Sequence, residues 1–147
     1  EKADHYTNKY MEMGHEREPE SRMEFQFKAT KQVEQVGLIF PDGRPGWHIS
    51  PDGLIIGEEA GLELKNVIPS TQVKYLDKNK LPTEYTTQVQ MSLFVTEWPV
   101  WYFCSHSPGL PLFILEVERD EGLIEIIKNE LGEFVLELDQ IVEKVAA

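Results

Sequence analysis

The spacing of the hydrophobic residues changes along this chain of 147 residues, and the change restricts the fold more than any other feature of the sequence. In residues 61–68 apolar and polar residues alternate, as in a strand, whereas after Pro82 apolar residues recur every three or four positions, as in a helix. The same criteria predict a helix within residues 1–29, strands at 32–40, 47–56 and 61–68, a helix at 82–96, strands at 100–106 and 112–118, and a helix at 120–147. We expect the first three strands to form a β-meander and Thr83 to cap the middle helix. This order predicts an α/β fold, in which helices flank a mixed β-sheet.

The predicted helix at 120–147 carries a stripe of apolar residues whose spacing alternates between four and three. The stripe consists of Ile127, Leu131, Phe134, Leu138, Ile141 and Val145. Such a stripe is typical of a helix that packs on a sheet, and also of the seam of a coiled coil. We expect the helix to lie on the sheet, with the coiled coil as the alternative.

The size and composition of the chain fit one domain with an ordinary hydrophobic core, over residues 1–147. The single cysteine, Cys104, cannot form an internal disulfide and lies in an apolar segment, so we expect a packed side chain and a reducing compartment. No segment of the sequence has the roughly 18 consecutive apolar residues of a membrane helix. These features predict a cytoplasmic protein without a membrane partner.

The net charge of −12 argues against nucleic acid as a partner, because a phosphate backbone repels an acidic surface. The acidic residues are concentrated at the end of the chain, however, where the 32 residues from Glu116 hold ten Asp or Glu against three Lys or Arg. A divalent cation also inverts the charge of the carboxylate site that binds it. Four lysines, at positions 65, 74, 78 and 80, lie close together in the sequence. They fit one basic surface that faces a substrate, and equally well scattered, solvated lysines in a loop.

Two carboxylates and a lysine form the most informative motif. Asp52 follows a proline, ten residues separate it from Glu63, and Lys65 comes two positions later. Because strand side chains alternate, Glu63 and Lys65 share one face of their strand, and a neighbouring strand could bring Asp52 beside them. Converging carboxylates favour Mg²⁺ or Mn²⁺, and a lysine beside the metal suits phosphodiester hydrolysis. On spacing alone, an ordinary turn followed by a solvated charge pair is the more common explanation of this pattern.

The segments around this motif resemble the lambda-exonuclease or YqaJ-like viral recombinase family, within the PD-(D/E)XK nucleases. The resemblance spans roughly residues 14–122. It is carried by Gly14-His15-Glu16-Arg17-Glu18-Pro19 with Arg22, Ser50-Pro51-Asp52-Gly53-Leu54, Gly61-Leu62-Glu63-Leu64-Lys65, Tyr85-Thr86-Thr87-Gln88-Val89-Gln90, Trp101-Tyr102-Phe103 and Val117-Glu118-Arg119-Asp120.

The resemblance implies a role for each matching residue. Asp52, Glu63 and the backbone carbonyl of Leu64 would bind Mg²⁺ or Mn²⁺, and Lys65 would be the catalytic lysine. Two further acidic residues fall on metal-site positions of the family, Glu18 and Asp42, although Glu18 could instead form a surface ion pair with Arg22 and Asp42 could serve its turn. Tyr85 and Gln88 match helix positions that face the site, and residues three apart share a helix face.

The resemblance also implies a Mg²⁺-dependent exonuclease that digests linear duplex DNA from an end, 5′ to 3′, and leaves single-stranded tails for phage-type recombination. It implies a homotrimer, a single-strand annealing protein as partner, and the cytoplasm of a bacterial host. Relatives usually carry a longer segment before the first motif, so we expect the N-terminal part to be missing here. The alternatives are a PD-(D/E)XK endonuclease or resolvase, and a non-catalytic acidic binding protein or DNA mimic.

Overall fold

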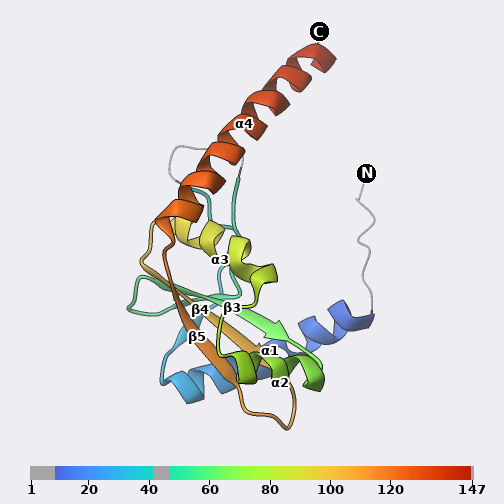
Figure 1. Ribbon diagram of the computed structural model, residues 1–147, viewed down its shortest axis with the longest axis vertical. Coiled ribbons are helices and arrows are strands. Elements are labelled where there is room, and N and C mark those ends of the chain that lie inside the picture. Colours follow the sequence, from blue (N-terminus) through green and yellow to red (C-terminus); the bar gives the residue numbers. More distant parts are fainter. Residues whose placement is uncertain (1–8, 42–46, 147) are drawn as a thin grey trace.

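A computed structural model gives the structure of residues 9–41 and 47–146 (Figure 1). The elements, in chain order, are α1 (Lys9–Ala29), β1 (Val33–Glu34), β2 (Gly53–Ile55), β3 (Ala60–Asn66), α2 (Pro69–Lys78), α3 (Thr83–Thr96), β4 (Val100–His106), β5 (Phe113–Glu118) and α4 (Glu121–Ala146).

The strands form one five-stranded sheet in the order β1-β2-β3-β4-β5. β3 and β4 are parallel, and the other neighbouring pairs are antiparallel. The parallel pair requires a crossover connection, which α2 and α3 supply. The expected α/β fold with a mixed sheet flanked by helices is therefore confirmed, as is the meander of the first three strands.

Helices cover both faces of the sheet, and a separate apolar cluster lies under each layer. On one face, Phe25 of α1 joins Leu62, Leu64 and Cys104. On the other face, residues of α2, α3 and the beginning of α4 surround Trp101 and Phe103 of β4. The expected alternation along β3 is confirmed, because Leu62 and Leu64 belong to the α1 face and leave Glu63 and Lys65 on the other. Cys104 is fully buried, as expected, and its burial raises the pKa of its thiol.

Gly61 is required by the packing of Trp101 against the parallel strand. The two residues are partners in the β3–β4 register, and a Cβ atom at position 61 would lie 2.2 Å from the Trp101 ring. A side chain there would displace the indole or separate the strands. This glycine therefore holds the beginning of the strand that carries Glu63 and Lys65.

Several predicted boundaries are wrong. The strands expected at 32–40 and 47–56 are reduced to β1 and β2, with a single bridge between Ile39 and Ile49. Thr83 is the first helical residue of α3 and does not cap it, since Pro82 occupies the cap position. Helix α2 was not predicted; it begins with Pro69 in its first turn, where a missing N–H group is tolerated.

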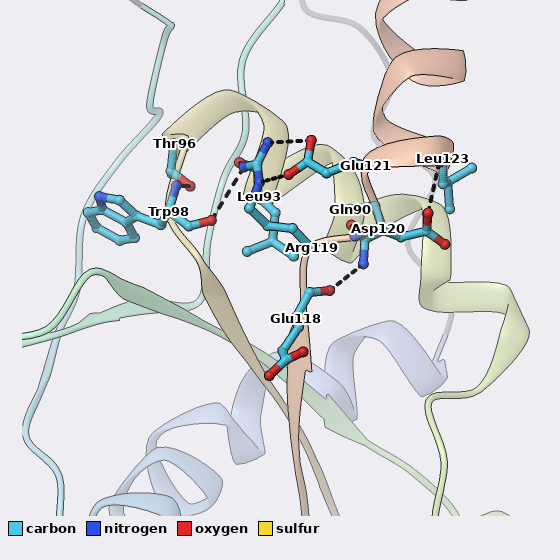
Figure 2. Close-up of polar contacts among 9 residues, drawn as sticks. All are labelled: Gln90, Leu93, Thr96, Trp98, Glu118, Arg119, Asp120, Glu121 and Leu123. Carbon is cyan, nitrogen blue, oxygen red and sulfur yellow. Dashed lines mark hydrogen bonds and ion pairs between the residues drawn. The ribbon is translucent and has the colours of Figure 1, made fainter.

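The direction of α4 is set at its junction with α3 and β5 (Figure 2). Gln90 donates to the carbonyl of Glu118 and accepts from the N–H of Asp120, which in turn caps α4 by accepting from Leu123 N–H at 3.0 Å. Arg119 donates to the carbonyls of Leu93 and Trp98. The polar side chains of this junction therefore fix the point at which α4 leaves the domain.

Beyond its first two turns, α4 extends away from the sheet (Figure 1). Ile124 and Ile127 are its buried residues, whereas Phe134 is 60% and Val145 83% exposed. The expectation that this helix lies on the sheet is therefore wrong for most of its length. Among the helices that the structure describes, none is long and apolar enough to span a membrane.

Candidate active site

Asp52 reaches β3 at the point where β2 separates from it. The antiparallel register pairs Gly53 with Leu62, and the N–H of Asp52 still donates to the Leu62 carbonyl at 3.1 Å. Pro51 precedes it, and no residue of β2 pairs with Leu64. The Asp52 carboxylate takes that place, since its Oδ2 accepts from the Leu64 N–H at 2.6 Å. This bond holds the carboxylate at the edge of β3, beside Glu63.

Glu63 lies between a lysine and an amide. Its side chain is 4% exposed, and its Oε1 forms an ion pair with the ammonium of Lys65. The same oxygen accepts from Nε2 of Gln88 in α3 at 2.8 Å. The ammonium of Lys65 also lies 5.0 Å from the centre of the Tyr85 ring, close enough for a cation–π contact. Tyr85 and Gln88 therefore lie on the α3 face directed at Glu63 and Lys65. Their three-residue spacing predicted that they share a face, and the family resemblance implied that this face is directed at the site.

Helix α1 contributes an ion pair that contacts the same loop. Arg22 pairs with Glu18 and donates from Nη2 to the Asp52 carbonyl at 3.2 Å. The Arg22 side chain is 9% exposed, so this is a partly buried contact, unlike the surface pair that the i,i+4 spacing also allowed. The spacing of Glu18 and Arg22 revealed their pairing, but not the bond of Arg22 to the Asp52 backbone.

Burial and charge raise the pKa of the Asp52 carboxyl group from its ordinary value of 3.8 to about 6. Burial is the main cause and the neighbouring charge of Glu63 adds to it, while the bond from the Leu64 N–H opposes both. Burial lowers the pKa of Lys65, but its bond with Glu63 and the charges of Glu63 and Asp52 outweigh burial, so the pKa lies above its ordinary value. Lys65 is accordingly an ammonium ion at neutral pH.

These residues fit a divalent metal ion. The carboxylates of Asp52 and Glu63 lie in a poorly hydrated site with a single ammonium group, that of Lys65. One negative charge is therefore unbalanced, and a bound cation would relieve the repulsion between the carboxylates. The N–H of Leu64 points to Asp52, and in a strand the carbonyl of the same residue points to the same side. Carboxylate oxygens of Asp52 and Glu63 with the Leu64 carbonyl thus form an oxygen-rich set suited to Mg²⁺ or Mn²⁺.

Asp42, the remaining candidate ligand, lies outside the described residues. A different group, which the sequence did not suggest, consists of Glu20, Glu24 and His106, whose possible ligand atoms lie within 4.8 Å of one another. His106 is buried, with its Nδ1 3.0 Å from Oδ1 of Asn66 and its Nε2 3.6 Å from Glu24. These contacts give the histidine a structural role at the end of β4.

Comparison with known proteins places the site in a family context. Residues 1–99 match the sequence profile of the YqaJ-like viral recombinase domain. No curated protein matches the chain. Among solved structures, the alkaline exonuclease LHK-Exo from Laribacter hongkongensis shares 30% identity with a TM-score of 0.86, over 95% of this chain and 74% of that one. The structure of LHK-Exo in complex with dAMP gives a TM-score of 0.87, also at 30% identity, over 95% of this chain and 73% of that one.

A more distant structure supports the same fold. A phage-related exonuclease from Haemophilus somnus 129PT is 13% identical with a TM-score of 0.63, over 97% of this chain and 76% of that one. The fold expected from the sequence, the PD-(D/E)XK nuclease core, is thereby confirmed. The profile match covers 99 of the 147 residues, and LHK-Exo aligns over nearly the whole chain. The chain belongs to the YqaJ-like viral recombinase domain family.

Proposed function

We propose that this protein is a metal-dependent exonuclease that hydrolyses phosphodiester bonds of duplex DNA. The observation that carries the proposal is the convergence of Asp52, from before β2, with Glu63 and Lys65 of β3. Membership of the YqaJ-like viral recombinase domain family and the similarity to the alkaline exonuclease LHK-Exo support it. The elements that hold these residues share one sheet, which supports a single nuclease domain.

Mg²⁺ or Mn²⁺, when bound, would supply a more acidic water molecule and a Lewis acid for the phosphate. Asp52, Glu63 and the carbonyl of Leu64 would hold the ion, with Glu18 and Asp42 as outer acidic residues. The bond from the Leu64 N–H fixes one oxygen of Asp52, which leaves its other oxygen free to bind. Gln88 orients Glu63, because its amide donates to Oε1 of that carboxylate.

Lys65 acts as a cation beside the reacting phosphate. Its raised pKa keeps it protonated, so it donates hydrogen bonds to the attacking water or to a phosphate oxygen. Tyr85 lies under the ammonium group and holds it in place through the ring contact. When substrate binds, the ammonium shifts its attraction from Glu63 towards the negative charge that develops on the phosphate.

The finer features of the proposal come from the family resemblance. The enzyme would use Mg²⁺, digest linear duplex DNA 5′ to 3′, and leave single-stranded tails for a single-strand annealing protein in phage-type recombination. It would do so in the cytoplasm of a bacterial host. A homotrimer is the proposed assembly. The exposed apolar stripe on α4 supports association with another chain, since Phe134 and Val145 contact no core within the described residues.

The test uses equal amounts of linear and covalently closed circular duplex DNA with Mg²⁺, and Lys65→Ala as a variant lacking the proposed cation. Loss of the linear DNA alone supports an exonuclease, whereas cleavage of the circle indicates an endonuclease or resolvase. If wild type leaves both intact, the nuclease proposal is wrong and the DNA-mimic alternative gains support. Linear duplexes labelled at the 5′ or the 3′ end of one strand then establish the direction of digestion.

A further inference from the structure

A hollow of about 300 Å³ lies between α2 and α3, and its lining is basic. Lys74 and Lys78 come from α2, and Lys80 from the loop that joins the two helices. The remaining lining residues are Thr71, Tyr75, Leu81, Pro82, Thr83 and Glu84. The hollow thus gathers three lysines in a protein whose net charge is −12.

These lysines have few acidic neighbours, although the charge of Lys78 acts on the Glu84 carboxylate. Within residues 66–83 the only acidic residue is Asp77. Among the described residues, no carboxylate lies within ion-pair distance of Lys74 or Lys80. Glu84 is the single acid that lines the hollow, and its Oε1 accepts a hydrogen bond from the Tyr75 hydroxyl at 2.9 Å. All three lysines are exposed, so a negatively charged ligand can reach them.

The hollow adjoins the active site through consecutive residues of α3. Glu84 lines the hollow. The next residue, Tyr85, contacts Lys65, whose Nζ lies 5.0 Å from the centre of the tyrosine ring. Pro82 and Thr83, at the beginning of the same helix, also line the hollow, and the Glu84 carboxylate accepts a hydrogen bond from its own N–H there. The partial positive charge of this helix N-terminus is therefore partly met by Glu84, and the lysines carry the attraction for an anion.

We propose that the hollow between α2 and α3 binds backbone phosphates of the DNA strand that the active site cleaves. This proposal rests on the proposed function. A strand whose scissile phosphate lies at Asp52 and Glu63 must continue past the site. Tyr85, under Lys65, and Glu84, in the lining of the hollow, are neighbours in α3, so the strand can pass from one to the other. Lysine ammonium groups suit this role, because they recognise phosphate as flexible point charges and do not read bases.

The experiment compares two double variants with the same change of charge. Lys74→Glu with Lys78→Glu alters the hollow, whereas Lys128→Glu with Lys144→Glu alters exposed lysines of α4. Binding of a fluorescent duplex is measured by anisotropy in EDTA, which prevents cleavage, over a range of salt concentrations. We expect the hollow variant to bind about tenfold or more weakly at 0.1 M salt, with a slope of log K against log salt about two units shallower than that of wild type. We expect the α4 variant to bind nearly as wild type does.

Two controls separate the possible explanations. The first control compares duplexes with a 5′-phosphate and with a 5′-hydroxyl. Backbone binding predicts that the hollow variant loses the same affinity for both. A loss confined to the phosphorylated duplex overturns the proposal in favour of a pocket that binds the DNA end. Lys74→Gln with Lys78→Gln tests the site without adding negative charge. Equal binding by wild type and both hollow variants overturns the inference even where wild type cleaves DNA. If wild type neither binds nor cleaves DNA, the proposed function fails as well.

Discussion

Replacing Asp52 with asparagine should abolish cleavage and yet stabilise the metal-free protein at alkaline pH. The reason is the pKa of this carboxyl group, which burial and the charge of Glu63 raise from 3.8 to about 6. The folded protein therefore binds the proton more tightly than the unfolded chain does. The free energy of unfolding falls as the pH rises from about 4, because Asp52 loses its proton at a lower pH in the unfolded chain than in the folded protein. The full destabilisation by the ionised carboxylate is present above about pH 7.

The size of the effect follows from the shift. A difference of about two pH units corresponds to about 3 kcal/mol, at about 1.4 kcal/mol per unit. The shift already includes the bond from the Leu64 N–H, which favours the ionised carboxylate, so nothing further is subtracted for the weaker bond to a neutral asparagine carbonyl. We therefore expect Asp52→Asn to raise the free energy of unfolding by about 3 kcal/mol at pH 8 and by only about 1 kcal/mol at pH 4.5.

The assay is urea unfolding in EDTA, followed by circular dichroism at both pH values. Glu59→Gln serves as the control, since it removes one negative charge from an exposed position of the β2–β3 turn. We expect no more than about 0.5 kcal/mol from that variant. An Asp52→Asn protein that is no more stable than Glu59→Gln at pH 8, or that gains equally at both pH values, would refute the reasoning.

Other variants test the remaining parts of the site and α4. Lys65→Ala should lower the rate of cleavage at least about 100-fold without a change in circular dichroism, because it removes the cation beside the phosphate; a rate near that of wild type would exclude the residue. Gln88→Ala should weaken Mg²⁺ binding about tenfold in calorimetry, because Glu63 loses the amide that orients it. Mg²⁺ at millimolar concentration should raise the melting temperature of wild type and not of Asp52→Asn, and an unchanged wild-type melt would argue against the site. Leu138→Glu with Ile141→Glu should leave monomer stability within about 0.5 kcal/mol, since both residues are exposed, but should shift sedimentation towards smaller species; an unchanged sedimentation profile would show that α4 does not join chains.

The part of the site that lies on one element could be predicted from the sequence. A period of two is enough to place Glu63 and Lys65 on one face, and a spacing of three is enough to place Tyr85 and Gln88 together. The approach of Asp52 depends on the register between β2 and β3, which pairs Gly53 with Leu62. Spacing in the sequence does not determine that register. Strand geometry only allowed Asp52 to lie beside Glu63, and the family resemblance assigned it to the site.

Helix α2 was missed because a polar residue occupies its core position. Gln72 is fully buried, and its amide donates to the carbonyls of Ser105 and Pro111 while it accepts from the Ser105 hydroxyl at 2.7 Å. A buried amide with all its bonds satisfied packs as well as an apolar side chain, but it interrupts the apolar period by which a helix is recognised. Because α2 was not predicted, the sequence could not show that Lys74 and Lys78 lie together on a helix beside the site.

Part of the net charge of −12 lies away from the proposed DNA contact once the charges are placed on the structure. Seven of the acidic residues belong to α4, which extends from the end of the molecule away from α2 (Figure 1). Residues 128–146 alone span about 28 Å at 1.5 Å per residue, well beyond the screening length of about 8 Å at physiological salt. Charges along the outer part of that helix therefore act weakly on a strand bound at the hollow of Lys74 and Lys78. What a DNA strand would meet is the local lysine charge and the metal, so the charge of the whole chain is a poor guide to its partner.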